Sequence, residues 1–165
     1  MLGQSAASSQ PPTQAQSTPL PSAAVTPKPL QQKQVKAYFT DENEMKLIEK
    51  EVTVSYEKED GVYAALLQAQ AKGDDPKAAT LFEDMKFQKV VFDQAKGELT
   101  IDIQFGPNSQ LGAPGEELFL QALKKSMFQF PEVKALFVLK DGKQVDSLMG
   151  HMELPYPIKR SNEMN

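Results

Sequence analysis

The sequence contains no cysteine and no tryptophan, and only one of its 165 residues, His151, is a histidine. Without cysteine the chain has no disulfide, no thiolate metal ligand and no cysteine nucleophile. A single histidine is more often a hydrogen-bonded structural residue than a catalyst, because a catalytic triad needs further groups around it. Zinc sites are built from several histidine and cysteine ligands. Nucleophilic catalysis, zinc binding and any other cofactor chemistry are therefore not expected.

Charge is nearly missing from the first 32 residues, which contain one lysine, Lys28, and no acidic residue. All 22 Asp and Glu residues lie in the remainder, which is mildly acidic and has no basic stripe. Because nucleic acids and anionic membranes are bound through clustered Lys and Arg, the chain is not expected to bind either. No apolar run approaches the ~20 residues that span a bilayer, and the opening residues do not resemble a signal peptide. The protein is therefore either cytosolic or normally preceded by a targeting segment.

The composition divides the chain into a tail and one domain. Residues 1–32 consist almost entirely of Ser, Thr, Gln, Ala and Pro, with six prolines between Pro11 and Pro29. Such a segment cannot bury enough apolar surface to offset its ordering entropy. We expect a disordered terminus, which is either an ordinary flexible end or a tether that holds the domain away from a surface. Residues 33–160 form a single predicted domain, and 161–165 a flexible tail.

Hydrophobic periodicity predicts six strands and two helices within this domain. Strand patterns occupy 35–39, 47–57, 86–93 and 98–105, and the last two flank a four-residue turn. A helix is predicted over 60–73, with Asp60 as a possible N-cap and Gly73 at its end. A second helix, over 116–130, has a stripe formed by Phe119, Ala122, Leu123, Met127 and Phe130. A final hairpin pairs 133–140 with 143–148 across Asp141-Gly142, a dipeptide favoured in a type I′ turn.

The resulting element order is β-β-α-β-β-α-β-β. It indicates an α+β fold, in which two helices pack on one face of a mostly antiparallel sheet. Phe128 and Phe130 cannot share one helical face, so we expect one of them to remain exposed.

Candidate catalytic and ligand-binding motifs are weak. The acidic runs at 41–44, 57–60 and 74–75 lack the ligand spacing of an EF-hand, although a glycosidase-like carboxylate pair remains an alternative. The loop at 106–115 precedes a helix but lacks the Gly-Lys-Ser/Thr ending of a phosphate-binding loop. Glu116 and Glu117 would repel phosphate, and are better explained as favourable charges at a helix N-terminus.

The sequence has a helix pattern at 63–73, a hairpin at 86–105 and a set of specific positions in its last third: Phe130, Pro131, Val133, Asp141, Gly142, Val145, Leu148, Gly150 and His151. Together they resemble the GerM domain, the sporulation and spore germination domain of bacteria. The resemblance covers about 35–160. We expect structural roles for these residues: Pro131 ends a helix, Asp141 and Gly142 set the turn, and Gly150 and His151 anchor the final segment. Replacing His151 by alanine should then reduce stability without affecting an activity.

The resemblance implies a non-enzymatic domain, similar in shape to ring-building domains and often carried by an exported lipoprotein. The leading hypothesis is an extracytoplasmic interaction or assembly domain with protein partners in the cell envelope, anchored only through a lipid or signal absent from this sequence. Binding would use sheet edges and helix faces, by strand addition or by packing of neighbouring copies. A module that binds cell-wall glycan or a small solute beside 106–115 is the alternative, and a carboxylate-dependent hydrolase is a third.

Overall fold

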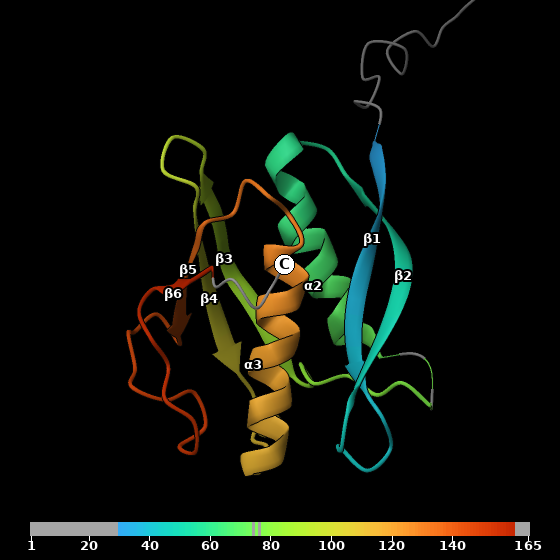
Figure 1. The fold of residues 1–165 in the computed structure, drawn as a ribbon, viewed down its shortest axis with the longest axis vertical. Helices are drawn as coiled ribbons and strands as arrows, with labels where there is room; N and C mark the ends of the chain where they lie inside the picture. Colours follow the sequence, from blue (N-terminus) through green and yellow to red (C-terminus); the bar gives the residue numbers. More distant parts are fainter. Residues whose placement is uncertain (1–29, 74, 76, 161–165) are drawn as a thin grey trace, which may run out of the picture.

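The computed structural model describes residues 30–73, 75 and 77–160 (Figure 1). The predicted tail and the predicted tether, apart from its last three residues, lie outside the described residues. The described elements follow the predicted order and confirm the α+β class. They are β1 (Gln31–Thr40), β2 (Leu47–Tyr56), the 3₁₀ turn η1 (Glu59–Gly61), α2 (Val62–Lys72), β3 (Met85–Asp93), β4 (Glu98–Phe105), α3 (Ala113–Phe128), β5 (Ala135–Lys140) and β6 (Ile158–Lys159).

The strands form two separate sheets. Strands β1 and β2 make an antiparallel hairpin, in which Gln31 pairs with Tyr56 and Thr40 with Leu47 without a break in register. The other sheet has the order β3-β4-β5-β6. Its neighbours are antiparallel except β4 and β5, which run parallel because α3 connects them.

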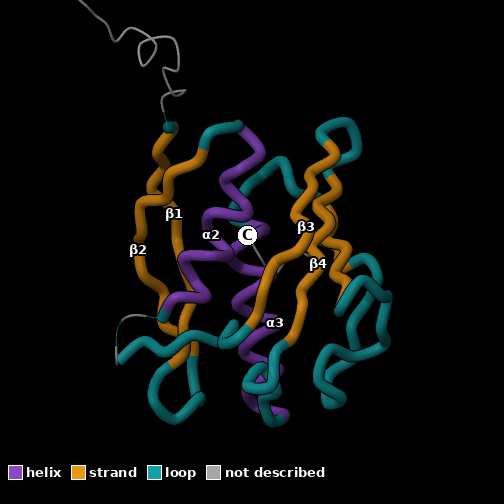
Figure 2. Tube along the Cα trace, turned by 180° about the vertical axis from the view of Figure 1, so that it is seen from behind, coloured by secondary structure: helices purple, strands orange, loops and turns teal. Residues whose placement is uncertain are grey.

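Helices α2 and α3 lie between the two sheets, as both views show (Figures 1 and 2). The helices cover one face of the four-stranded sheet. On this face every second side chain of β4 points towards the helices, and Leu99, Ile101 and Ile103 are fully buried there. Across this layer, the Phe82 and Phe119 ring centroids are 4.8 Å apart. One continuous apolar core therefore joins the hairpin, both helices and the larger sheet.

Three details of the sequence prediction are wrong. The last strand is β6, at Ile158–Lys159, and not 143–148, because beyond the turn only Lys143 bridges back to β5. Phe128 and Phe130 are both buried at 3% exposure, since α3 is enclosed by neighbouring elements and Phe130 lies beyond its end. Asp60 does not cap α2, whose N-cap is Gly61.

Candidate functional site

Three resemblance positions, Leu148, Gly150 and His151, lie in a segment that a buried carboxylate holds. Glu116 lies in the first turn of α3 and is fully buried. Its oxygens accept hydrogen bonds from the Ser147 hydroxyl at 3.1 Å and from three backbone amides: Met149 at 3.1 Å, His151 at 2.9 Å and Met152 at 3.2 Å. Glu116 thus ties the irregular segment 147–152 to the helix. We call this arrangement the Glu116 clasp.

Glu116 was predicted to act only as a favourable charge at a helix N-terminus. Its place in the first turn agrees with that interpretation. Its oxygens, however, accept four hydrogen bonds from residues 147–152, which are distant in sequence. A signal for this was present in the sequence. Glu116 precedes Phe119, Leu120 and Leu123 by three, four and seven residues, so it heads the apolar stripe of α3. A carboxylate on a buried stripe requires donors, because burying an unpaired charge is costly.

A second carboxylate holds the Asp141-Gly142 turn. Asp141 and Gly142 have φ values of 50° and 82°, and Lys140 and Lys143 exchange two backbone hydrogen bonds across them. Both observations match the predicted turn. Asp102 of β4 accepts the Gly142 amide at 2.8 Å and is 8% exposed. Asp102 alternates with the apolar Ile101 and Ile103 along β4, a pattern that predicts an exposed side chain, but the turn covers it.

The remaining resemblance positions do not converge on one pocket. Phe130 and Val133 are buried at the end of α3, and Pro131 between them is exposed. The Arg160 guanidinium donates to both the Phe130 and the Val133 carbonyl at 2.7 Å. Leu148 is buried beside the clasp, whereas Val145 is half-buried. The motif is thus spread over two regions of packing.

His151 itself is exposed, and no hydrogen bond of its imidazole is found among the described residues. The backbone amide of His151, and not its ring, anchors the segment to Glu116. Gly150 has a φ of 97° that favours glycine. The expected loss of stability on removing the His151 ring therefore has no contact in the structure to support it.

The loop at 106–115, beside which a ligand groove was predicted, is folded back onto the protein. Ser109 is buried, and its hydroxyl donates to the carbonyls of Glu83 and Asp84 at 2.9 and 3.1 Å. The Gln110 side chain donates to the Met149 carbonyl at 2.8 Å. Polar groups of this loop thus hold two segments in place: residues 147–152 and the residues just before β3.

A hollow with an acidic lining lies instead at the N-terminal end of α2. Its volume is about 390 Å³, and its polar lining includes Lys33, Glu59, Asp60, Tyr63 and Glu132. The Tyr63 hydroxyl donates to Glu132 at 2.7 Å. Burial, followed by the hydrogen bond to Glu132, raises the pKa of Tyr63 well above its ordinary value. The phenol is a donor and not a base. In the part of the chain that the structure describes, no group of three His, Asp or Glu side chains is arranged to bind a metal ion.

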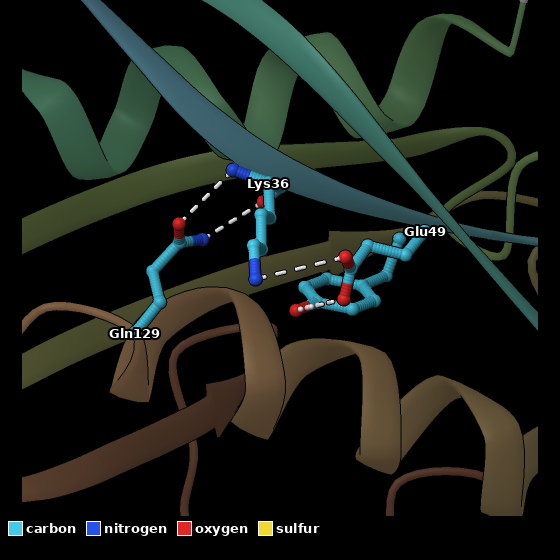
Figure 3. Close-up of polar contacts among 4 residues, drawn as sticks. Lys36, Glu49 and Gln129 are labelled. Carbon is cyan, nitrogen blue, oxygen red and sulfur yellow. Dashed lines mark hydrogen bonds and ion pairs between the residues drawn. The ribbon is translucent and has the colours of Figure 1, made fainter.

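The two edges of the β1-β2 hairpin differ sharply. Gln129 closes the β1 edge at Lys36: its Oε1 accepts the Lys36 amide at 3.0 Å, and its Nε2 donates to the Lys36 carbonyl at 2.8 Å (Figure 3). The fully buried Gln70 accepts the Tyr38 amide at 2.8 Å, and Thr40 exchanges two backbone hydrogen bonds with Ala79. Side chains and a bridge thus satisfy the outer edge of β1 from Lys36 to Thr40.

The outer edge of β2 has no such partner among the described residues. It borders three adjoining hollows between β2 and α2, with volumes of about 350, 210 and 480 Å³. The middle hollow is lined on the strand side by Thr53, Val54 and Ser55, and on the helix side by Ala65 and Ala69 among others. We call this feature the β2–α2 groove. It is an exposed strand edge above a helix face of small side chains.

A comparison with protein families identifies the domain. A family model described as Germane, sporulation and spore germination, matches residues 36–146, which is more than half of the chain. The chain belongs to this family. The match includes β2, both helices and the Asp141-Gly142 turn, and it ends before Leu148, Gly150 and His151. No curated protein matches the sequence.

Solved structures agree with the Germane fold. The chain is 14% identical to the first GerMN domain of the sporulation protein GerM from Bacillus subtilis, with a TM-score of 0.59, covering 78% of this chain and 98% of that one. A candidate lipoprotein from Clostridium perfringens gives 18% identity and a TM-score of 0.55, over 79% and 88% of the two chains. With the tandem GerMN domains of the Bacillus subtilis protein, the identity is 21% and the TM-score is 0.51, covering 79% of this chain and 45% of that one. At these identities the likeness shows the fold alone.

Proposed function

We propose that this Germane domain is a non-enzymatic interaction or assembly domain of an exported bacterial envelope protein, with a role in sporulation or spore germination. The observation that carries the proposal is the edge of the ten-residue strand β2, which no segment within 30–73, 75 and 77–160 covers, whereas the edge of β1 is closed from Lys36 to Thr40. Main-chain groups at such an edge bind extended segments of partner proteins. The structural likeness to a candidate lipoprotein supports an envelope location.

The use of the buried carboxylates also supports a role without catalysis. Glu116 and Asp102 both accept backbone amides, which fix a loop and a turn. A general acid or base needs access to a substrate proton, and these two side chains are buried. Neither described helix has the length and apolar character needed to cross a bilayer. We also propose that a lipid anchor or signal attaches the domain to the envelope, as in an exported lipoprotein.

Photo-cross-linking in the bacterium that carries the gene tests this function. A photoreactive residue would replace Thr53 on β2 or, as a matched control, Lys96 in the β3-β4 turn, which lies on the far side of the helices (Figure 2). We expect a discrete adduct with an envelope protein at position 53 during sporulation or germination, and none at position 96. An enzymatic turnover by the purified domain, abolished by one Asp or Glu substitution, would contradict the proposal.

Binding of cell-wall glycan or a small solute is the second candidate, and the acidic hollow favours it. Glu59, Asp60 and Glu132 gather there around the Tyr63 hydroxyl, and this chemistry suits an ammonium group such as the free amine of a peptidoglycan stem peptide. Titration with a muropeptide, followed by amide chemical shifts, tests the candidate. Saturable shifts confined to Tyr63 and Glu132 would support it, and the absence of shifts would eliminate it.

A further inference from the structure

The hydrogen bonds of β1 determine which groups of β2 face outward. In an antiparallel pair, opposed residues alternate between exchanging both backbone hydrogen bonds and pointing those groups away. Lys36, Tyr38 and Thr40 direct their amides away from β2, towards Gln129, Gln70 and Ala79. The β2 residues paired with these three therefore also direct their backbone N–H and C=O groups outward, away from β1. The same holds for every second residue further along β2. The outward-facing positions of β2 are Leu47, Glu49, Glu51, Thr53 and Ser55.

This edge lacks the backbone features that usually block pairing. Natural edge strands are protected by bulges, by proline, by short length, by charged side chains or by a covering segment. Of these features, β2 has charged side chains, at Glu49, Lys50 and Glu51. Strand β3, the edge of the larger sheet, has a register shift between Phe87 and Lys89. Strand β2 has ten residues in unbroken register and contains no proline. Its amides and carbonyls thus form a regular template for one more strand.

The β2–α2 groove is shaped for such a strand. A third strand would run about 4.8 Å from β2, and it would lie over the face of α2 that carries Ala65 and Ala69. Both alanines are only half-buried, although they pack against the core. Side chains of the added strand that point towards α2 would fill the hollows beside Val52 and Val54. Beside Val52 and Val54 the groove therefore favours apolar residues at alternate positions, although the charged side chains of Lys50 and Lys72 also line it.

The opposite face of β2 sets the charge of the partner. Glu49 and Glu51 lie on this face. Glu49 forms an ion pair with Lys36 at 3.7 Å, and Glu51 accepts a hydrogen bond from the side-chain Nε2 of Gln34 at 3.1 Å. Both glutamates are exposed, so a residue placed opposite either of them gains from a positive charge. A second copy centred on Glu51 would place two glutamates against each other, which is unfavourable.

We propose that the β2 edge binds, by antiparallel strand addition, an extended segment of a partner protein in which apolar residues alternate with Lys or Arg. The inference rests on the proposed interaction function and names the surface, the binding mode and the chemistry of the partner. Apolar side chains enter the β2–α2 groove, and cationic side chains lie beside Glu49 and Glu51. Backbone hydrogen bonds supply most of the affinity and the alternation supplies the specificity.

Residue-resolved amide exchange by NMR with a synthetic peptide tests the proposal. The probe is the blocked peptide Thr-Val-Thr-Val-Lys-Val-Lys, which in antiparallel alignment places its lysines opposite the two glutamates. Saturation should slow exchange about 10-fold or more at the outward amides, Glu49, Glu51, Thr53 and Ser55. The amides that already bind β1 should not change; they belong to Ile48, Lys50, Val52 and Val54. Uniform protection, or none, would overturn strand addition.

Matched variants separate the backbone from the side chains. Thr53→Pro removes one outward amide without touching the β1 ladder, and proline is tolerated at such a position. It should abolish the protection, whereas Thr53→Ala should retain it. Glu51→Lys should weaken binding of the lysine peptide about 10-fold, and a peptide with Glu in place of Lys should show the reverse preference. Equal binding of both peptides by both proteins would overturn the charge assignment.

Two further outcomes identify what has failed. If the same alternating protection grows with protein concentration and without peptide, the occupant is a second copy and the partner assignment falls. If the peptide does not bind but position 53 is cross-linked to an envelope protein in the cell, the interaction function stands and this inference alone fails. If neither occurs, the proposed function fails as well.

Discussion

Replacement of Glu116 by glutamine is the most informative test of the fold around the resemblance motif. The fully buried carboxylate accepts the Ser147 hydroxyl and three backbone amides. Hydrogen bonds to charged groups contribute about 1.5–3 kcal/mol each, but they are not additive here because desolvation of the carboxylate opposes them. Glutamine keeps one carbonyl oxygen and points its NH₂ group at backbone donors. We expect the free energy of unfolding to fall by about 2–4 kcal/mol.

Urea denaturation followed by circular dichroism measures this change. The neighbouring Glu117 is exposed on the same turn, so Glu117→Gln is a control with the same change in charge, and it should shift stability by no more than about 0.5 kcal/mol. Amide exchange at Met149, His151 and Met152 should accelerate in Glu116→Gln alone. Equal stability of the two variants, or unchanged exchange in the segment, would refute the clasp as a major stabilising contact.

Three other predictions follow from the structure. Asp102→Ala should cost about 1–3 kcal/mol in urea denaturation, because the Gly142 amide loses its acceptor in a part-buried hydrogen bond to a charged group. A smaller loss than in Gln104→Ala, on the exposed part of the same strand, would contradict this. Burial, followed by the charge of Glu49, raises the pKa of Tyr38 from 10.0 to about 12. The folded state therefore keeps this proton to a higher pH than the unfolded chain does. The contribution of Tyr38 to stability is fully present below pH 10 and is lost as the pH rises towards about 12. Tyr38→Phe should flatten this decline, and an unchanged pH profile would refute the assignment. His151→Ala should change stability by less than about 0.5 kcal/mol because the ring is exposed, whereas Gly150→Ala, at a φ of 97°, should cost more; the reverse order in thermal melts would restore a structural role for the imidazole.

Local patterns in the sequence predicted most of the elements correctly. The β3-β4 hairpin has the predicted strands almost to the residue, because its alternation and its turn are short-range features. Helix α2 ends at Gly73, whose φ of 54° is the left-handed conformation that glycine adopts readily. The Asp141-Gly142 turn was predicted for the same kind of reason.

The features that were missed depend on contacts between distant residues. The division into two sheets and the parallel pairing of β4 with β5 arise from tertiary packing, which periodicity does not encode. The Glu116 clasp joins residues more than 30 positions apart, and Asp102 is buried by a turn 40 positions away. The β2 edge could be recognised only when Gln129 and Gln70 were seen to close the edge of β1.

We propose that this Germane domain works by holding a partner protein at the β2 edge. Complementation in the bacterium that carries the gene tests it most directly. A strain without the gene would receive the wild-type, Thr53→Ala or Thr53→Pro protein at equal levels, and spore formation and germination would be counted. We expect the first two proteins to restore spore formation and germination, and Thr53→Pro to fail to do so. Full rescue by a folded Thr53→Pro protein would contradict it.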